Sequence, residues 1–361
     1  MIPYLLIFSL SIYFTFLANK TPRSSGLFYI YSICAILLPS LLAGFRDLSI
    51  GTDTVNYLYY FENSISYSNF ESFLTSNPNV EPGFLLLNYL VSRFSQEYVF
   101  FLFTVHLIIV LLIYISAFKI RNYITPSWVM FIFLFMMYNE SLNAMRQYIA
   151  ISLSLYAFAI YMNNKKTWLY ILFIIIATMF HRTAFICLAM ILIFYWTNKF
   201  TVRHNFKQLL FYTTIFLLLI IFGQSFYLPL ITDSFGGKYE GYLSTNVDGG
   251  LSLSSFLVYL TTAFYICYKA WRMSDKIMDV FFISSLFAVF LLLLSSISVQ
   301  LYRLSLYFFI ILILAISYIF RRNSSFKSVI RLFFIIMFIF FWFYSYSYRG
   351  SHSTIPYVSI F

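Results

Sequence analysis

Apolar stretches repeat along almost the whole chain, and mostly short polar segments separate them. Most approach the roughly 20 residues that a helix needs to cross the hydrocarbon core of a bilayer. The fourth to seventh are short, which favours broken or steeply tilted helices there. The pattern predicts an all-α polytopic membrane protein whose residues 1–361 form a single integral membrane domain. We expect about twelve transmembrane helices, at residues 1–18, 27–45, 98–118, 126–142, 146–162, 167–181, 183–198, 209–228, 252–270, 279–299, 303–320 and 330–348.

Two of the polar segments are long, at about 46–97 and 229–251. The first contains EPGFLLLNYLVSRF, residues 81–94, in which apolar residues follow a Pro-Gly turn at nearly helical spacing. That spacing predicts an amphipathic helix on the membrane surface. The second contains GGKYEGYLSTNVDGG, whose glycines and small polar residues favour a mobile loop or lid.

Charge fixes an expected orientation for these spans. The chain is 61% hydrophobic and 10% charged, which excludes an ordinary soluble domain. Most basic residues gather in every second polar segment, and ten of the 12 acidic residues lie in the others. By the positive-inside rule the basic segments face the cytoplasm, so both chain ends and both long loops face outward. The net charge of +11 then comes mostly from basic loops that stay in the cytoplasm beside anionic lipid, and it does not indicate a nucleic-acid partner.

Several kinds of chemistry have no motif here. The chain lacks a Walker loop, GxSxG, HExxH and an Asp-x-Asp pair. Its cysteines, Cys34, Cys187 and Cys267, lie inside expected spans and form no CxxC pair. We therefore expect no cofactor, no metal site and no disulfide.

The densest polar segment is AGFRDLSIGTDTVNYLYYF, residues 43–61. In one interpretation it is a phosphate and sugar site, with Arg46 on a phosphate and Asp53 on a hydroxyl or acting as a base. In the other it is a helix exit followed by an N-cap of the next helix. The remaining candidates for substrate contact in this segment are Thr52, Thr54 and Tyr57.

A second polar segment, YNESLNAMRQYIA, lies at a membrane boundary. Polar groups at such depth are costly and usually line a cavity. Glu140 is a candidate catalytic carboxylate, Arg146 a candidate anion ligand, and Asn143 and Gln147 candidate substrate contacts. The alternative is a short turn between antiparallel helices whose polar side chains reach the interface.

Other candidates come from separate parts of the chain. His181 and Arg182 lie between two expected spans on the outer side, where a histidine acts as a base or stays a structural hydrogen-bonding residue. Arg303 and Tyr307 lie one helical turn apart. His106 is expected to be packed inside a span, and His204 and His352 to lie in solvent or at an interface.

Four arginines lie at the outer ends of expected helices. Arg suits phosphate because its planar guanidinium donates two parallel hydrogen bonds and keeps its charge. Their common side of the membrane predicts one convergent anionic site, bound by Arg46, Arg146, Arg182 and Arg303.

At these segments the chain resembles the EpsG-like branch of the Wzy-type polysaccharide polymerases. The resemblance covers nearly the whole chain in order, through GFRDLSIGTDTVNYLYYF, EPGFLLLNYL, NAMRQYIAISLSLYAFAIY, FHRTAF, KYEGYL and RLSLYF. It implies a GT-C-like membrane glycosyltransferase of the bacterial inner membrane, with a site facing the periplasm.

The resemblance also implies the substrates. They are oligosaccharide repeat units linked to undecaprenyl pyrophosphate, which such enzymes polymerise into O-antigen, capsule or exopolysaccharide. The arginines would stabilise the leaving pyrophosphate, and Asp53 or His181, with Glu140 behind them, would take the acceptor proton. Tyr239 and Tyr242 would stack on sugars or lipid. A chain-length regulator is a further partner implied by the family.

Three other functions fit parts of the pattern. An O-antigen ligase would share the outer arginines and the lipid-linked donor. A flippase or transporter would carry internal repeats and polar groups at mid-membrane, which the sequence does not favour. A multispan acyltransferase would be centred on a histidine, for which His181 is the candidate.

Overall fold

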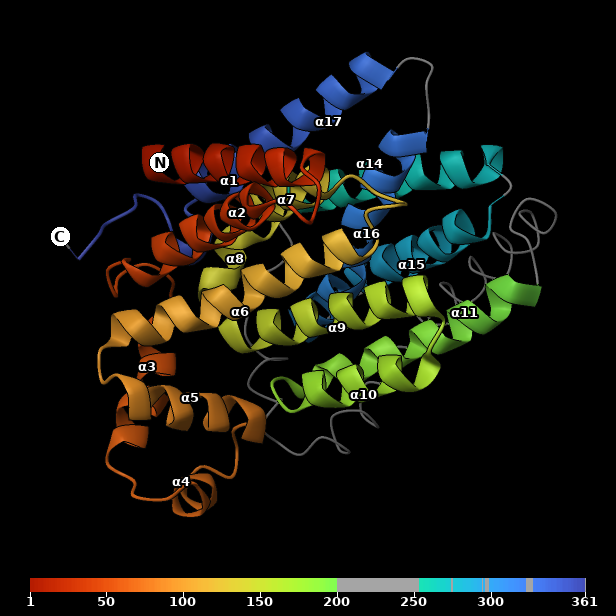
Figure 1. Ribbon diagram of the computed structural model, residues 1–361. Helices are drawn as coiled ribbons and strands as arrows, with labels where there is room; N and C mark the ends of the chain where they lie inside the picture. The colour runs from red at the N-terminus through yellow and green to blue at the C-terminus, as the bar shows by residue number, and fades with distance from the viewer. Residues whose placement is uncertain (200–252, 274, 294, 296–298, 323–326, 361) are drawn as a thin grey trace. The chain divides into compact units, whose positions relative to one another are not determined.

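The computed structural model describes residues 1–199, 253–273, 275–293, 295, 299–322 and 327–360 (Figure 1). These ranges are helical and contain no β-strand, and their only β feature is a bridge between Arg46 and Ser359. The expected all-α fold is confirmed there. The elements are α1 (Ile2–Lys20), α2 (Gly26–Gly44), α3 (Thr54–Ile65), α4 (Phe70–Ser76), α5 (Pro82–Phe94), α6 (Tyr98–Lys119), α7 (Pro126–Met136), α8 (Tyr138–Asn143), α9 (Met145–Asn164), α10 (Thr167–Thr178), η1 (Arg182–Leu188), α11 (Ala189–Lys199), α14 (Leu253–Arg272), α15 (Lys276–Leu293), α16 (Val299–Arg322), α17 (Lys327–Trp342), η4 (Phe343–Tyr348) and η5 (Ser351–Ser353).

Several of these helices are long and apolar enough to cross a membrane. In the described part of the chain there are six: Ile2–Lys20, Gly26–Gly44, Tyr98–Lys119, Lys276–Leu293, Leu301–Arg322 and Ser328–Tyr348. Two shorter apolar helices, α7 and α10, accompany them. The protein is therefore a helical membrane protein. The expected span at 209–228 lies outside the described residues, and the total of about twelve spans and the GT-C-like fold stay predictions.

The helices group into two compact units, Met1–Phe185 with Ser317–Phe361, and Ile186–Ile316. In the second unit α14 and α11 each pack against α15. Lys276 Nζ there donates to the carbonyl of Asn198 over 3.1 Å, and the ring of Tyr259 stacks on Phe309. The single integral membrane domain stays a prediction.

The first unit is a layer of neighbouring helices with a small group of helices at one end. α1 lies beside α2, α2 beside α6, α6 beside α9, and α9 beside α10 (Figure 1). Within the same unit α7 packs against α1 and α17. The short helices α3, α4 and α5 gather at the end where α6 begins (Figure 1).

Hydrogen bonds show which segments of the chain lie together at each end of the first unit. At the end where α6 finishes, Arg23 Nη2 donates to the carbonyl of Phe118 over 3.0 Å, and Arg321 Nη1 to that of Ile124 over 3.2 Å. At the other end the Tyr4 hydroxyl donates to the carbonyl of Thr354 over 2.9 Å, so both chain termini lie there. This division agrees with the expected alternation of loops. Which end faces the cytoplasm stays a prediction.

The span expected at 126–142 is wrong as one continuous helix. α7 ends at Met136, the backbone leaves helical geometry at Met137, and α8 follows as a separate, wholly buried turn. A second break at Ala144, with φ −101° and ψ 52°, separates α8 from α9. Polar side chains that compete for backbone hydrogen bonds weaken a helix at such points. The expectation of broken helices in this region is confirmed.

The amphipathic helix expected at 81–94 is present as α5, with Pro82 in its first turn. Its buried face contacts α3 and α6, and the rings of Phe84 and Phe101 meet edge to face. Much of the apolar face is therefore covered by the protein itself. Its position on the membrane surface stays a prediction.

Candidate functional site

Arg46 is fully buried just after the C-terminal end of α2. Its exposed fraction is 0%, and Nη2 donates to the carbonyl of Leu142 over 2.9 Å and to the Thr54 hydroxyl over 3.4 Å. Its Nε and Nη1 atoms have no hydrogen-bond partner in the described part of the chain. Buried polar groups are nearly always hydrogen-bonded, so these two donors require an explanation.

The charge on Arg46 also lacks a counter-ion. No Asp or Glu in the described ranges forms an ion pair with it. Burial lowers the pKa of Arg46 to about 10, although the hydroxyls of Tyr4, Tyr138 and Tyr357 oppose this, so the guanidinium stays protonated at neutral pH. A buried cation without an anion is costly, and an anionic ligand would supply the missing charge.

The loop after Arg46 makes a sharp turn at Gly51. Its φ is +89°, and a Cβ there would lie 2.7 Å from the Thr54 hydroxyl oxygen. Glycine alone adopts such a conformation without strain. Asp53 takes the N-cap position of α3, yet its side chain makes no capping hydrogen bond. The carboxylate is therefore not used as the capping group that the alternative interpretation predicts.

Asn143 joins this loop to the break between α8 and α9. Its Oδ1 accepts from the Thr52 hydroxyl over 2.9 Å and from the backbone N–H of Asp53 over 2.8 Å. Because these two donors fix the amide orientation, Nδ2 is the donor toward His352 Nδ1, 3.3 Å away. His352 is partly exposed, which is compatible with its expected place at an interface.

The C-terminal segment, residues 350–360, folds back over the Arg46 loop, which sequence reasoning missed. Arg46 and Ser359 form an antiparallel bridge, and the N–H of Asp47 donates to the carbonyl of Val358 over 2.9 Å. The Tyr357 hydroxyl donates to the carbonyl of Leu42 over 2.9 Å. These contacts help to enclose the Arg46 side chain.

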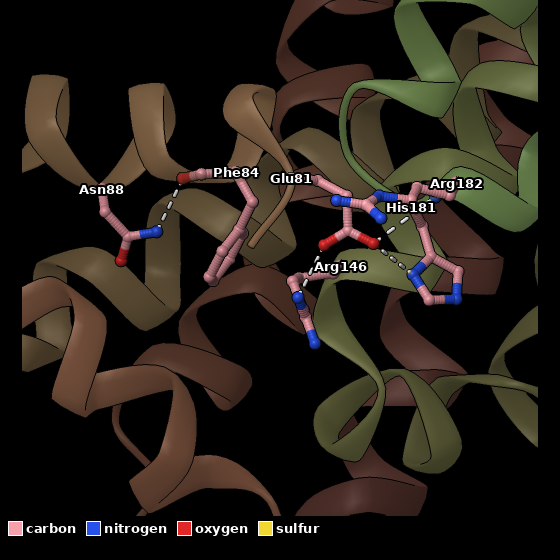
Figure 2. A network of polar contacts seen from close by, with 6 residues as sticks. All are labelled: Glu81, Phe84, Asn88, Arg146, His181 and Arg182. Atoms are coloured by element: carbon pink, nitrogen blue, oxygen red, sulfur yellow. Dashed lines mark hydrogen bonds and ion pairs between the residues drawn. The ribbon is translucent and has the colours of Figure 1, made fainter. Parts of the chain in front are cut away.

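A second charged group centres on Glu81, at the N-cap of α5. Figure 2 shows its carboxylate between Arg146 and His181. Oε2 lies 2.6 Å from Arg146 Nη1, and Oε1 lies 3.3 Å from His181 Nδ1. The backbone N–H of Arg182 lies 3.5 Å from Oε1.

Electrostatics favour the ionised form of Glu81. Its side chain is 8% exposed, and burial alone opposes ionisation. The contacts with His181 and Arg146 outweigh that cost and lower the pKa of Glu81 to about 2. The Arg146 guanidinium also lies over the rings of Tyr57 and Phe84, at 5.6 and 5.7 Å from their centroids.

Sequence reasoning did not single out Glu81. The one available signal is a glutamate that directly precedes a helix-starting proline, a place where a carboxylate normally serves the helix. Its side chain makes no capping hydrogen bond, and instead pairs with residues from α9 and the α10–η1 turn.

The two charged groups share the junction of α8 and α9. Arg46 contacts Leu142, and its Nη2 lies 3.9 Å from Met145 Sδ, beside Arg146 in the chain. Arg46, Arg146 and Arg182 thus belong to the first unit. Arg303 and Tyr307 belong to the second, so the convergence of all four arginines stays a prediction.

The other expected site residues have different environments. Glu140 is buried and accepts from the Tyr148 hydroxyl over 3.0 Å, and Gln147 is buried. His106 is buried with Nδ1 3.0 Å from the Leu102 carbonyl, which confirms its expected packing. Tyr239 and Tyr242 lie outside the described residues.

The described part of the chain has no evident metal-binding site. Those residues include no group of three or more His, Cys, Asp or Glu side chains placed to hold a metal ion. Independence of metals and cofactors stays a prediction.

The fold and the site define a helical membrane protein with a buried cation and a carboxylate–imidazole pair at one end of its first unit. The EpsG family model matches residues 29–359, and the chain belongs to that family. Family membership indicates a membrane protein similar to polysaccharide polymerases. No curated protein and no solved structure gives a significant match.

Proposed function

We propose that the protein is a membrane glycosyltransferase that polymerises oligosaccharide repeat units linked to undecaprenyl pyrophosphate. It acts at the outer face of the bacterial inner membrane, in the synthesis of O-antigen, capsule or exopolysaccharide. The observation that carries this proposal is the buried, protonated Arg46, which lacks an acidic partner and has two unused donors among the described residues. A lipid pyrophosphate is an anion of the kind that such a group binds.

The reaction joins an acceptor hydroxyl to the anomeric carbon of the donor sugar. The bond between that carbon and the pyrophosphate oxygen breaks, and its electron pair leaves with the pyrophosphate. A fixed positive group stabilises the charge that develops there. Arg46 is the strongest candidate, because Glu81 already balances much of the charge on Arg146. Arg182 and Arg303 are proposed as further ligands.

Access to Arg46 sets a condition on this mechanism. The side chain is enclosed, with residue 359 bridged to its backbone and Leu142 bonded to its guanidinium. Direct contact with pyrophosphate therefore requires the C-terminal segment to move. Without that movement, Arg46 acts on the leaving group through its electric field, which is strong where water is excluded.

The acceptor proton needs a base, and three candidates remain. Asp53 is partly exposed and its side chain does not cap α3. Glu140 is buried and already accepts a hydrogen bond from Tyr148. His181 lies against Glu81, and neither of its ring nitrogens makes a hydrogen bond in the described ranges. The geometry favours His181.

The remaining parts of the proposal concern binding. Thr52, Asn143 and Gln147 would contact sugar hydroxyls from the α8–α9 junction and the neighbouring loop. Tyr239 and Tyr242 would stack on sugars or lipid. A chain-length regulator is the proposed protein partner, and no metal is required.

Deletion of the gene tests this function in cells. The strain would be complemented with wild type, with Arg46→Met, or with Arg93→Met. Arg93 is a matched outer-loop arginine, exposed and bonded to the carbonyl of Ser64. We expect wild type and Arg93→Met to restore long polymer, whereas Arg46→Met leaves single repeat units.

The same experiment separates the alternatives. Loss of a ligase leaves long polymer on the lipid carrier, and loss of a flippase leaves lipid-linked units on the cytoplasmic side. Either result in the deletion strain, or full polymer length with Arg46→Met, contradicts the proposed role.

A further inference from the structure

His181 lies in a firmly held backbone turn between α10 and η1. Its N–H donates to the carbonyl of Ala177 over 3.0 Å, and its own carbonyl accepts from Ala184 over 3.0 Å. The side chain is 16% exposed, with Nδ1 toward Glu81 (Figure 2). Nδ1 and Nε2 are both buried, and neither makes a hydrogen bond within the described part of the chain, although Nδ1 lies within ion-pair distance of Glu81. One ring nitrogen thus faces a carboxylate, and the other is unused.

The Glu81 carboxylate is fixed relative to that turn. Arg146 binds one of its oxygens, and the backbone N–H of Gly83 donates to the carbonyl of Met179 over 2.8 Å. A Cβ on Gly83 would lie 2.7 Å from that carbonyl oxygen. Only glycine permits this approach, which brings the start of α5 against the turn that carries His181.

The nearby carboxylate favours one position for the proton of His181. An ionised carboxylate only accepts hydrogen bonds, so it favours the tautomer with the proton on Nδ1. At 3.3 Å the contact lacks hydrogen-bond geometry in this structure, and catalytic contacts of this kind commonly tighten when substrate binds. Nε2 is then left with a free lone pair.

We propose that Glu81 is a positioning residue that holds the proton of His181 on Nδ1, so that Nε2 is the base in glycosyl transfer. This rests on the proposed function. As the acceptor oxygen bonds to the anomeric carbon, its proton passes to Nε2. The pyrophosphate leaves with the electron pair of the broken carbon–oxygen bond. The imidazolium then returns the proton to water, and Glu81 stabilises it meanwhile.

The charged groups that face His181 allow one competing role. They are Glu81, Arg146 on the far side of that carboxylate, and the neighbouring Arg182. If His181 were protonated at rest, it would serve as a further cation for pyrophosphate. A base must lose its proton before it works, whereas a cation must keep it, so the two roles give opposite dependence on pH.

The test measures polymerisation by purified protein in proteoliposomes. The substrate is lipid-linked single repeat units extracted from a strain that lacks the gene. Rates per folded protein, judged by size-exclusion chromatography, would be measured from pH 5 to 9 for wild type and three variants, Glu81→Gln, His181→Gln and Glu97→Gln. Glu97 is the matched control, because it is the exposed N-cap of α6 with similar backbone geometry and no capping bond.

We expect the activity of wild type and of Glu97→Gln to increase as pH rises over the acidic part of the range. Glu81→Gln presents an amide N–H to Nδ1 and favours the wrong tautomer, so kcat falls by about 10² to 10⁴ with little change in KM. The dependence of its remaining kcat on pH should differ from that of wild type, because the group that faces Nδ1 no longer carries a charge. A purely structural role would lower the yield of folded protein and leave this profile unchanged.

His181→Gln keeps the Glu81–Arg146 pair and removes the base. It therefore tests the proposal even if Glu81→Gln does not fold. A wild-type kcat and pH profile in both variants would overturn the proposal. So would activity of the wild-type protein that falls as pH rises over the acidic part of the range. If wild type itself forms no polymer, the proposed function fails instead.

Discussion

Nδ2 of Asn143 lies 3.3 Å from Nδ1 of His352, a residue 209 positions later in the chain. The same amide accepts from Thr52 through its oxygen. One buried side chain therefore ties together the break between α8 and α9, the loop after α2 and the C-terminal segment. The geometry around Arg46 depends on this connection, because two of those three segments enclose it.

Replacement of Asn143 by alanine should loosen all three segments. It leaves the Thr52 hydroxyl, the Asp53 backbone N–H and the His352 ring without their partner, at a cost of about 1 to 3 kcal/mol. We expect a lower melting temperature in detergent and shorter polymer. Asn56→Ala, at an exposed asparagine of α3, is the control and should match wild type. His352→Ala should add little to Asn143→Ala, and fully additive effects would show that the two residues are not coupled.

Gly51→Ala tests the turn that follows Arg46. The new Cβ would meet the Thr54 hydroxyl at 2.7 Å in a backbone with positive φ, a strain of roughly 1 to 3 kcal/mol. Polymer length should fall sharply. Gly26→Ala has open space and no positive φ, so it should behave as wild type. Equal polymer in the two variants would exclude a role for the turn.

Gly83→Ala should separate the start of α5 from the turn that carries His181. A Cβ there would lie 2.7 Å from the backbone oxygen of Met179. A backbone atom cannot move aside as the end of a flexible side chain can. We expect loss of most polymerisation with a modest loss of melting temperature. If activity stays at the wild-type level, the close approach of Glu81 to His181 does not matter for the reaction.

Glu81 predicts a specific loss of stability in acid. Its pKa of about 2 in the folded protein lies below its ordinary value of 4.5. The stabilisation it gives is therefore present above about pH 4.5 and is lost as pH falls toward 2. The melting temperature should drop more steeply over this range for wild type than for Glu81→Gln. Parallel curves for the two proteins would contradict the ion pair, and Glu97→Gln should follow wild type.

The sequence predicts the helices and the residue types of the site better than it predicts their partners. Periodic apolar residues after Pro82 are enough to predict α5, and runs of apolar residues predict α1, α2 and α6. The polar run from Glu140 to Gln147 marks a boundary where the helices do break. These features depend on neighbours in the chain, which a sequence shows directly.

The contacts that define the site join residues far apart in the chain. Glu81 meets Arg146 across 65 positions. The C-terminal segment meets Arg46 through the backbone of Ser359. A short helix start and a chain end carry no local signal for such pairing. For the same reason His181 could be named as a candidate base, whereas its partner could not.

Polymerisation by purified protein measures what the charge of Arg46 contributes to the reaction. Wild type, Arg46→Met and Arg93→Met would be reconstituted with lipid-linked single repeat units, and product length followed with time. We predict that Arg46→Met slows polymerisation by about 10² to 10³, the effect of removing one fixed group that stabilises developing negative charge. It should melt no lower than wild type, because an unpaired buried charge is removed. Arg93→Met should polymerise normally. A folded Arg46→Met protein that polymerises at the wild-type rate would show that the charge of Arg46 does not act in the reaction.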